Sequence, residues 1–141
     1  MSTRAGSKTP AQTFALVFGV VYLLIGIVGF AVTGFDDFAS DTFGEKLLIF
    51  PLNPLHNLVH IAIGALWIGA SRAHDSAKST NTLVGAVYLL TAILGFAGIL
   101  DFLAIEDASS ADNFLHLGSA ILSLYFGTAG AEGPRTTTAT A

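Results

Sequence analysis

Apolar residues gather in four long stretches that contain no Asp, Glu, Lys or Arg. A helix needs about 20 residues, at a rise of about 1.5 Å each, to cross a hydrocarbon layer about 30 Å thick. The stretches have about this length, which predicts an all-α protein, a four-helix transmembrane bundle. We expect the helices near residues 12–34, 53–72, 80–103 and 111–130. The charge-free stretches themselves are Phe14–Phe35, Leu47–Ser71, Ser79–Leu100 and Asn113–Ala131.

The first and third stretches repeat one another without a gap. Residues 19–30 read GVVYLLIGIVGF and residues 85–96 read GAVYLLTAILGF. The stretches that follow share the shorter pattern N-x-x-H, at residues 57–60 and 113–116. Duplicated helical units are typical of membrane proteins. The pattern predicts two parallel-repeated helical hairpins, residues 14–71 and 80–130, related by a pseudo-twofold axis along the membrane normal.

The composition indicates the same class of protein. Hydrophobic residues make up 52% of the 141 residues, charged residues only 11%, and the mean hydropathy is +0.68. A soluble domain carries about 25% charged residues. We therefore expect a multi-pass protein of the cell membrane, with the lipid bilayer as its partner. A single membrane domain is expected over residues 12–131, between a polar tail at 1–11 and a disordered tail at 132–141.

Charged residues divide unequally between the two sides of such a bundle. Five of the six basic residues fall on the side of the two termini, and Lys46 falls on the other. Cytoplasmic loops of membrane proteins carry an excess of Lys and Arg, so we expect both termini to be cytoplasmic. His60 and His116 then lie at matching depths near the external ends of the second and fourth helices.

Small residues form a stripe on the first and third predicted helices, and each stripe contains one Tyr. Small residues let helix backbones approach closely in lipid, and a Tyr hydroxyl among them needs a hydrogen-bonding partner. Tyr22 and Tyr88 either support helix packing or line a ligand site, and the Gly-rich faces could also join copies into a homo-oligomer or a larger membrane complex. The stripes are Gly19, Tyr22, Gly26, Gly29 and Thr33, and Gly85, Tyr88, Ala92 and Gly95.

Polar residues share faces on the second and fourth predicted helices. His56 and His60 are one helical turn apart, as are Asp112 and His116. Three imidazoles and one carboxylate suit a divalent metal ion, whereas His60 and His116 alone could be the axial ligands of a haem. A third alternative is a pocket for a quinone or another small ligand. The residues that would line it are Tyr22, Asn57, His60, Tyr88, Asn113 and His116.

A purely structural role explains the same residues. Polar side chains within membrane helices usually face the interior and pair with each other. Asn57 would pair with His116, and Asn113 with His60, across the axis. Such pairs stabilise by about 0.6–2 kcal/mol each, which suffices to account for their presence.

The segment before the second helix contains two further expectations. Pro54 suits the first helical turn, with Asn53 as the N-cap, and the apolar end of residues 44–51 could lie along the membrane interface. Asn53, His56 and Asp112 lie close to the predicted water boundary, where solvation is sufficient to explain them.

Several classes of activity lack their motifs. The absence of Cys excludes disulfides and thiolate metal sites. The sequence also contains no Gly-rich phosphate-binding loop, no G-x-S-x-G motif of hydrolases and no run of basic residues that would indicate nucleic-acid binding. The spans contain no Asp, Glu, Lys or Arg near the midplane of the membrane, which argues against a proton pump or an ion-coupled transporter. We expect a small binding or accessory protein rather than an enzyme, with no catalytic residue and no cofactor. The alternative is a haem- or divalent-metal-dependent membrane redox protein.

The elements N-P-x-H-N-x-x-H at residues 53–60 and D-N-x-x-H at residues 112–116, with the Tyr-centred stripes, carry a resemblance. Together they resemble an uncharacterised four-span family, domain of unknown function 4383 (DUF4383), found mostly in actinobacteria. The resemblance covers nearly all of residues 12–130. It implies a four-helix integral membrane protein and implies no activity, ligand or partner.

Overall fold

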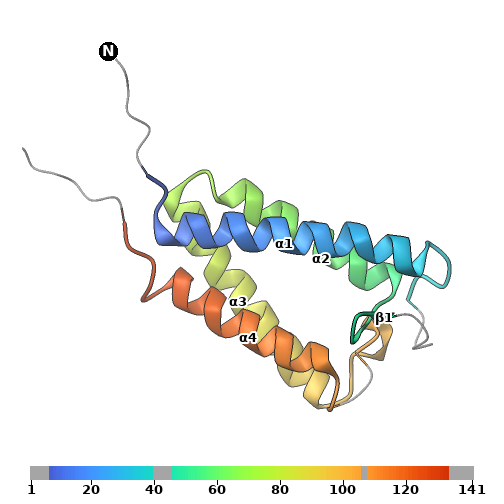
Figure 1. The fold of residues 1–141 in the computed structure, drawn as a ribbon. Coiled ribbons are helices and arrows are strands. Elements are labelled where there is room, and N and C mark those ends of the chain that lie inside the picture. Colours follow the sequence, from blue (N-terminus) through green and yellow to red (C-terminus); the bar gives the residue numbers. More distant parts are fainter. Residues whose placement is uncertain (1–6, 40–45, 106–107, 134–141) are drawn as a thin grey trace, which may run out of the picture.

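A computed structural model describes residues 7–39, 46–105 and 108–133. Within these ranges the chain is mostly helical, with four α-helices, one turn of 3-10 helix and a two-stranded antiparallel hairpin (Figure 1). Expectations for the outermost residues of both tails fall outside the described ranges. The elements are α1 (Pro10–Thr33), β1 (Lys46–Leu47), β2 (Phe50–Pro51), α2 (Pro54–Ala70), α3 (His74–Phe96), η1 (Asp101–Leu103) and α4 (Ala111–Gly127).

The two helices of the first half begin where their capping residues predict. Thr9 and Gln12 form a capping box at the start of α1, and Pro10 follows as the first helical residue. At α2, the Asn53 side chain accepts a hydrogen bond of 2.8 Å from the backbone N–H of His56, and Pro54 is the first helical residue. This confirms the expected N-cap of the second helix.

Helix α3 differs from the prediction at both ends. It begins at His74 rather than near residue 80, because residues 74–79 continue the helix and Ala77 is completely buried. It ends at Phe96 rather than near residue 103. Gly98 has a φ of +67°, and the N–H of Ile99 donates to the carbonyl of Leu94, which together form a Schellman motif. The remaining residues to 105 turn back over the bundle.

The helices pack as two close pairs, α1 with α2 and α3 with α4 (Figure 1). Contacts of α1 with α3, of α2 with α3 and of α1 with α4 join the pairs. We expect from the sequence that the second and fourth helices are neighbours across the axis. Among the described residues, their backbones do not form a packed pair, and they face each other through long side chains.

The same contact recurs at corresponding positions of the two helix pairs. A Cβ atom at Gly29 would overlap the Asn57 side chain, and a Cβ atom at Gly95 would overlap the Asn113 side chain. The glycines of the predicted stripes are therefore buried inside each pair, where Gly29 and Gly95 let the asparagines approach the neighbouring backbone. These Gly-rich faces are occupied within the chain.

Polar side chains lie inside the molecule, beside an apolar core that includes Phe14, Trp67 and Val84. Asn57, Asn81, Asn113 and Ser123 are completely buried, while large aliphatic side chains on all four helices point outward. Two helices, α1 and α3, are long and apolar enough to cross a membrane, and α2 is apolar but shorter.

The start of α1, the end of α4 and the short α2–α3 link lie at one end of the molecule (Figure 1). The β1–β2 hairpin and η1 lie at the opposite end. The hairpin pairs Leu47 with Phe50, and its tip exposes Leu48 and Ile49.

Candidate functional site

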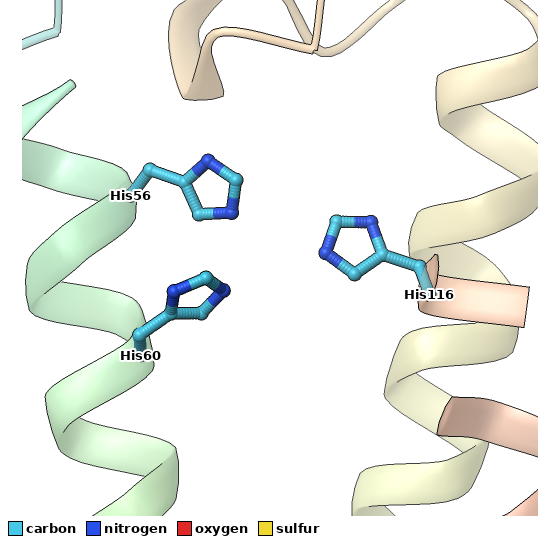
Figure 2. A group of neighbouring side chains, drawn as sticks. All are labelled: His56, His60 and His116. Carbon is cyan, nitrogen blue, oxygen red and sulfur yellow. The ribbon is translucent and has the colours of Figure 1, made fainter. Parts of the chain in front are cut away.

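Three histidine side chains meet between the two helix pairs (Figure 2). His56 and His60 come from consecutive turns of α2, and His116 reaches toward them from α4. One ring nitrogen of each residue lies within 4.8 Å of the others. In Figure 2, each ring turns a nitrogen toward the space between them. The geometry is therefore that of a convergent three-imidazole cluster.

The cluster is removed from solvent. The three side chains are 2%, 3% and 2% exposed for His56, His60 and His116. Within the described part of the chain, neither ring nitrogen of His60 has a hydrogen-bond partner, and the same holds for Nδ1 of His56 and of His116. Buried polar atoms are nearly always hydrogen-bonded. Four such nitrogens lie in one place, where they are available to a ligand.

Two tyrosine rings pack against the histidine cluster. The Tyr22 ring meets the His60 ring edge-on at 5.2 Å, and the Tyr88 ring stacks on the His116 ring at 5.2 Å. The two Tyr rings lie 5.6 Å apart, and the Tyr22 hydroxyl is 2.7 Å from Ser119 Oγ. Tyr22 thus has the partner that its position requires, and both rings fix the orientation of a neighbouring imidazole.

The segment after α3, which includes η1 (Asp101–Leu103), covers the cluster and is called the roof below. Leu103 of η1 lines the space above the imidazoles. The Asn53 side-chain amide donates to the carbonyl of Phe102 at 2.9 Å, which attaches this segment to the start of α2. The expectation that Asn53, His56 and Asp112 are solvated is therefore wrong, because the folded-back segment covers this end of the bundle and all three are buried.

The space between the side chains is small. It has a volume of about 50 Å³, and its lining includes the three histidines, Tyr88 and Thr91. Pockets for drug-sized molecules and cofactors measure about 300–1,000 Å³, whereas a water molecule occupies about 30 Å³. A haem or a quinone does not fit this space, but an ion with one water molecule does.

The predicted metal set of four residues becomes a set of three. Asp112 is buried one turn before His116 on α4, but its carboxylate is outside the group of converging ligand atoms. It occupies a neighbouring position at the same end of the bundle.

The side chains of Asn57 and Asn113 make different contacts from those expected. The Asn57 amide donates to Thr33 Oγ1 at 2.9 Å, within its own helix pair, rather than to His116 across the axis. Asn113 packs on Gly95, also within its own pair. The expected Asn57–His116 pair is wrong. The space left by Gly29 and Gly95 accommodates both asparagine side chains against the adjacent helix, away from the axis. Neither asparagine lines the space between the histidines.

Two residues important for this arrangement were not singled out in the sequence. Asn81 accepts a hydrogen bond from the indole of Trp67 at 3.0 Å and donates to the carbonyl of Ala11 at 3.1 Å, joining three helices. Its position in an apolar stretch of a chain with one Trp was the available signal. Leu103 had no such signal, because its role depends on where α3 ends.

Comparison with known proteins gives one match. The model of a family described as a domain of unknown function (DUF4383) matches residues 12–129. The chain belongs to the DUF4383 family. The match confirms the resemblance seen in the sequence, and it covers the three histidines and nearly all of the four helices. No curated protein and no solved structure matches the chain.

Proposed function

We propose that the protein is a multi-pass integral membrane protein that binds an ion, or a ligand of a few atoms, between its two helix pairs. Its histidines hold the ligand in the external half of the bundle, and both termini are cytoplasmic. The observation that carries the ligand site is the set of buried imidazole nitrogens without partners. The pattern of exposed side chains carries the membrane location.

The distribution of side chains supports the membrane location. Asn, Ser and His side chains face inward, and large aliphatic side chains face outward on all four helices. Contiguous exposed apolar surface is rare on soluble monomers, whereas lipid chains solvate such a surface well. The outward residues include Val17, Leu24 and Ile27 on α1, Leu58 and Leu66 on α2, Leu83, Leu90 and Ile93 on α3, and Phe114 and Ile121 on α4.

The charged residues support the orientation. Lys8 precedes α1, and Arg72 and Lys78 belong to the α2–α3 link and the start of α3, which lie at one end of the molecule, whereas Lys46 belongs to β1 at the other end. An excess of basic residues marks the cytoplasmic side. The three histidines then belong to the external half, below the roof formed by η1.

The sequence repeat and the matching glycine–asparagine contacts support an origin by duplication. Gly29 and Gly95 correspond in the aligned segments, as do Asn57 and Asn113. In each helix pair, the Gly of one helix contacts the corresponding Asn of the other helix. Each half supplies one Tyr–His ring contact to the site. His56 has no counterpart in the second half, because Asp112 corresponds to it in the alignment, so the ligand site is asymmetric.

The unpartnered nitrogens support a binding role. Each buried polar atom without a partner costs about 1–3 kcal/mol. A ligand that accepts the lone pairs of the imidazoles removes this cost. Among the described residues, no thiol, serine or carboxylate lines the space between the histidines, so we propose binding rather than catalysis.

Cysteine labelling tests the orientation directly, because the chain contains no Cys of its own. Asp36→Cys places a thiol at an exposed position just after α1, and Ser76→Cys places one at an exposed position in the first turn of α3. In intact cells, we expect a membrane-impermeant maleimide to label the residue 36 variant and to label the residue 76 variant only after permeabilisation. Recovery of the protein in the soluble fraction, or the reverse labelling pattern, contradicts the proposal.

A further inference from the structure

We propose that His56, His60 and His116 bind one borderline transition-metal ion, of which Zn²⁺ is the representative. The inference rests on the proposed function, since it names the ligand of that same site. It does not depend on the orientation of the chain in the membrane.

The spacing of the three imidazoles fits a metal ion. Zn–N bonds measure about 2.0–2.1 Å, which places two nitrogens of a tetrahedral site about 3.3 Å apart. The ligand nitrogens here lie within 4.8 Å of one another. Small side-chain rotations bring them to bonding distance, because two of the ligands are one turn apart on α2 and the third faces them.

The chemistry of the ligands selects the class of ion. Three neutral imidazoles without a thiolate or a carboxylate suit Zn²⁺, Cu²⁺, Ni²⁺ or Co²⁺, whereas Mg²⁺ and Ca²⁺ prefer oxygen. The carboxyl group of Asp112 is buried one turn before His116 on α4. Such nearby carboxyl groups support metal-bound histidines in many proteins.

Three protein ligands leave one coordination position for a water molecule. The space of about 50 Å³ accommodates an ion and one water. Tyr88 and Thr91 line this space, so these two side chains would adjoin the bound water. The site thus has the three-ligand composition of an open zinc centre rather than a closed structural one.

The ion would join the two helix pairs at the point where they make least backbone contact. His56 and His60 belong to the first pair and His116 to the second, and α2 and α4 do not form a packed pair among the described residues. A metal bridge would therefore replace the missing helix–helix contact.

The test uses the full chain without a polyhistidine tag, purified in detergent, treated with a chelator and then dialysed against ZnCl₂. Elemental analysis should find about one Zn²⁺ per chain. His60→Gln and His116→Gln should each weaken binding at least tenfold, because each removes a direct ligand. The matched control is His74→Gln at the opposite end, where the ring bonds Thr9 at 2.9 Å, and it should bind as the unmodified chain does.

Spectroscopy keeps the inference testable if a variant does not fold. Co²⁺ bound by three imidazoles and a water gives the visible absorption of a tetrahedral nitrogen site, and Zn²⁺ should displace it from the unmodified chain. Lack of binding by a folded, monodisperse chain overturns the inference, as does binding that His60→Gln and His116→Gln leave unchanged.

The failure of this inference is distinguishable from the failure of the proposed function. A small organic molecule or a different ion seen by native mass spectrometry, and lost in His60→Gln, overturns the transition-metal assignment and leaves the binding site in place. Absence of any bound species in protein taken from its own membrane, together with no metal binding, contradicts both.

Discussion

At Gly29 and Gly95, a missing side chain makes room for a polar one. Both glycines face an Asn of the adjacent helix so closely that a Cβ atom would overlap the amide. The amides are thereby held inside each pair, and the axis remains available to the histidines. Asparagines and histidines that are neighbours in the sequence therefore have different surroundings.

We predict that Gly95→Ala lowers the free energy of unfolding by about 1–3 kcal/mol, the usual cost of overpacking. Gly69→Ala is the control, because a Cβ atom there meets nothing within 4 Å. It should be neutral or slightly stabilising, since Ala is the better helix former. Denaturant titration in detergent, followed by circular dichroism, measures both. Equal effects of the two substitutions would contradict the packing argument.

A second prediction concerns Asn81. Its replacement by Leu removes the acceptor of the Trp67 indole and the donor to the Ala11 carbonyl, so we expect a loss of about 1–3 kcal/mol from groups left unpaired. The fluorescence of Trp67, the chain's only Trp, should shift as well. Thr91→Val is the control, since its hydroxyl bonds only within α3, to Val87. An unchanged emission spectrum in Asn81→Leu would refute the proposed contact.

At the scale of elements, the end of α3 decides whether the site is covered. The Schellman motif at Gly98 stops the helix, and the following turn places Leu103 above the imidazoles. If the helix continued to residue 103, this segment would project beyond the bundle and the histidines would face solvent. A glycine outside the site therefore has an effect on its burial.

Gly98→Ala tests this role of the helix end. A Cβ atom meets nothing within 4 Å at Gly98 or at Gly118, so the two substitutions differ in backbone conformation rather than in contacts. Only Gly98 has a positive φ, +67°, and an L-residue there costs about 1–2 kcal/mol. We expect Gly98→Ala to lower stability by that amount and to speed chemical modification of His56. Gly118→Ala should do neither, and equal modification rates would show that the roof is independent of Gly98.

At the scale of the whole molecule, two helix pairs meet around polar side chains and present apolar residues outward. The pairs hold themselves together through glycine contacts, while the interface between them is filled by aromatic rings and imidazoles. An ion at the interface would act on the association of the pairs more than on either pair alone.

We predict that Zn²⁺ raises the temperature at which the unmodified chain unfolds. Free metal at 100 times the dissociation constant contributes about 2.7 kcal/mol to stability. His116→Gln, which removes the only ligand from the second pair, should lose nearly all of this gain, whereas His74→Gln should retain it. Thermal unfolding with and without metal gives the comparison. Equal gains in all three proteins would mean that Zn²⁺ binds elsewhere.

The sequence by itself determined the features that depend on local periodicity. Helical turns bring residues 3 and 4 apart to one face, so the pairing of His56 with His60 and the inward stripes of Tyr22 and Tyr88 could be predicted. The cap at Asn53 follows from local chemistry in the same way. The family also followed from these elements, since its motifs are short and contiguous.

Only the tertiary structure decided which side chains share the site. The rotation and spacing of the helices place His116 opposite His56 and leave Asp112 outside the group. The glycine contacts turn Asn57 away from the axis, and the left-handed residue Gly98 bends the roof over the histidines. These outcomes depend on packing between segments far apart in the chain, and helical periodicity carries no information about the distance between two helices or about the path of the chain after a helix ends.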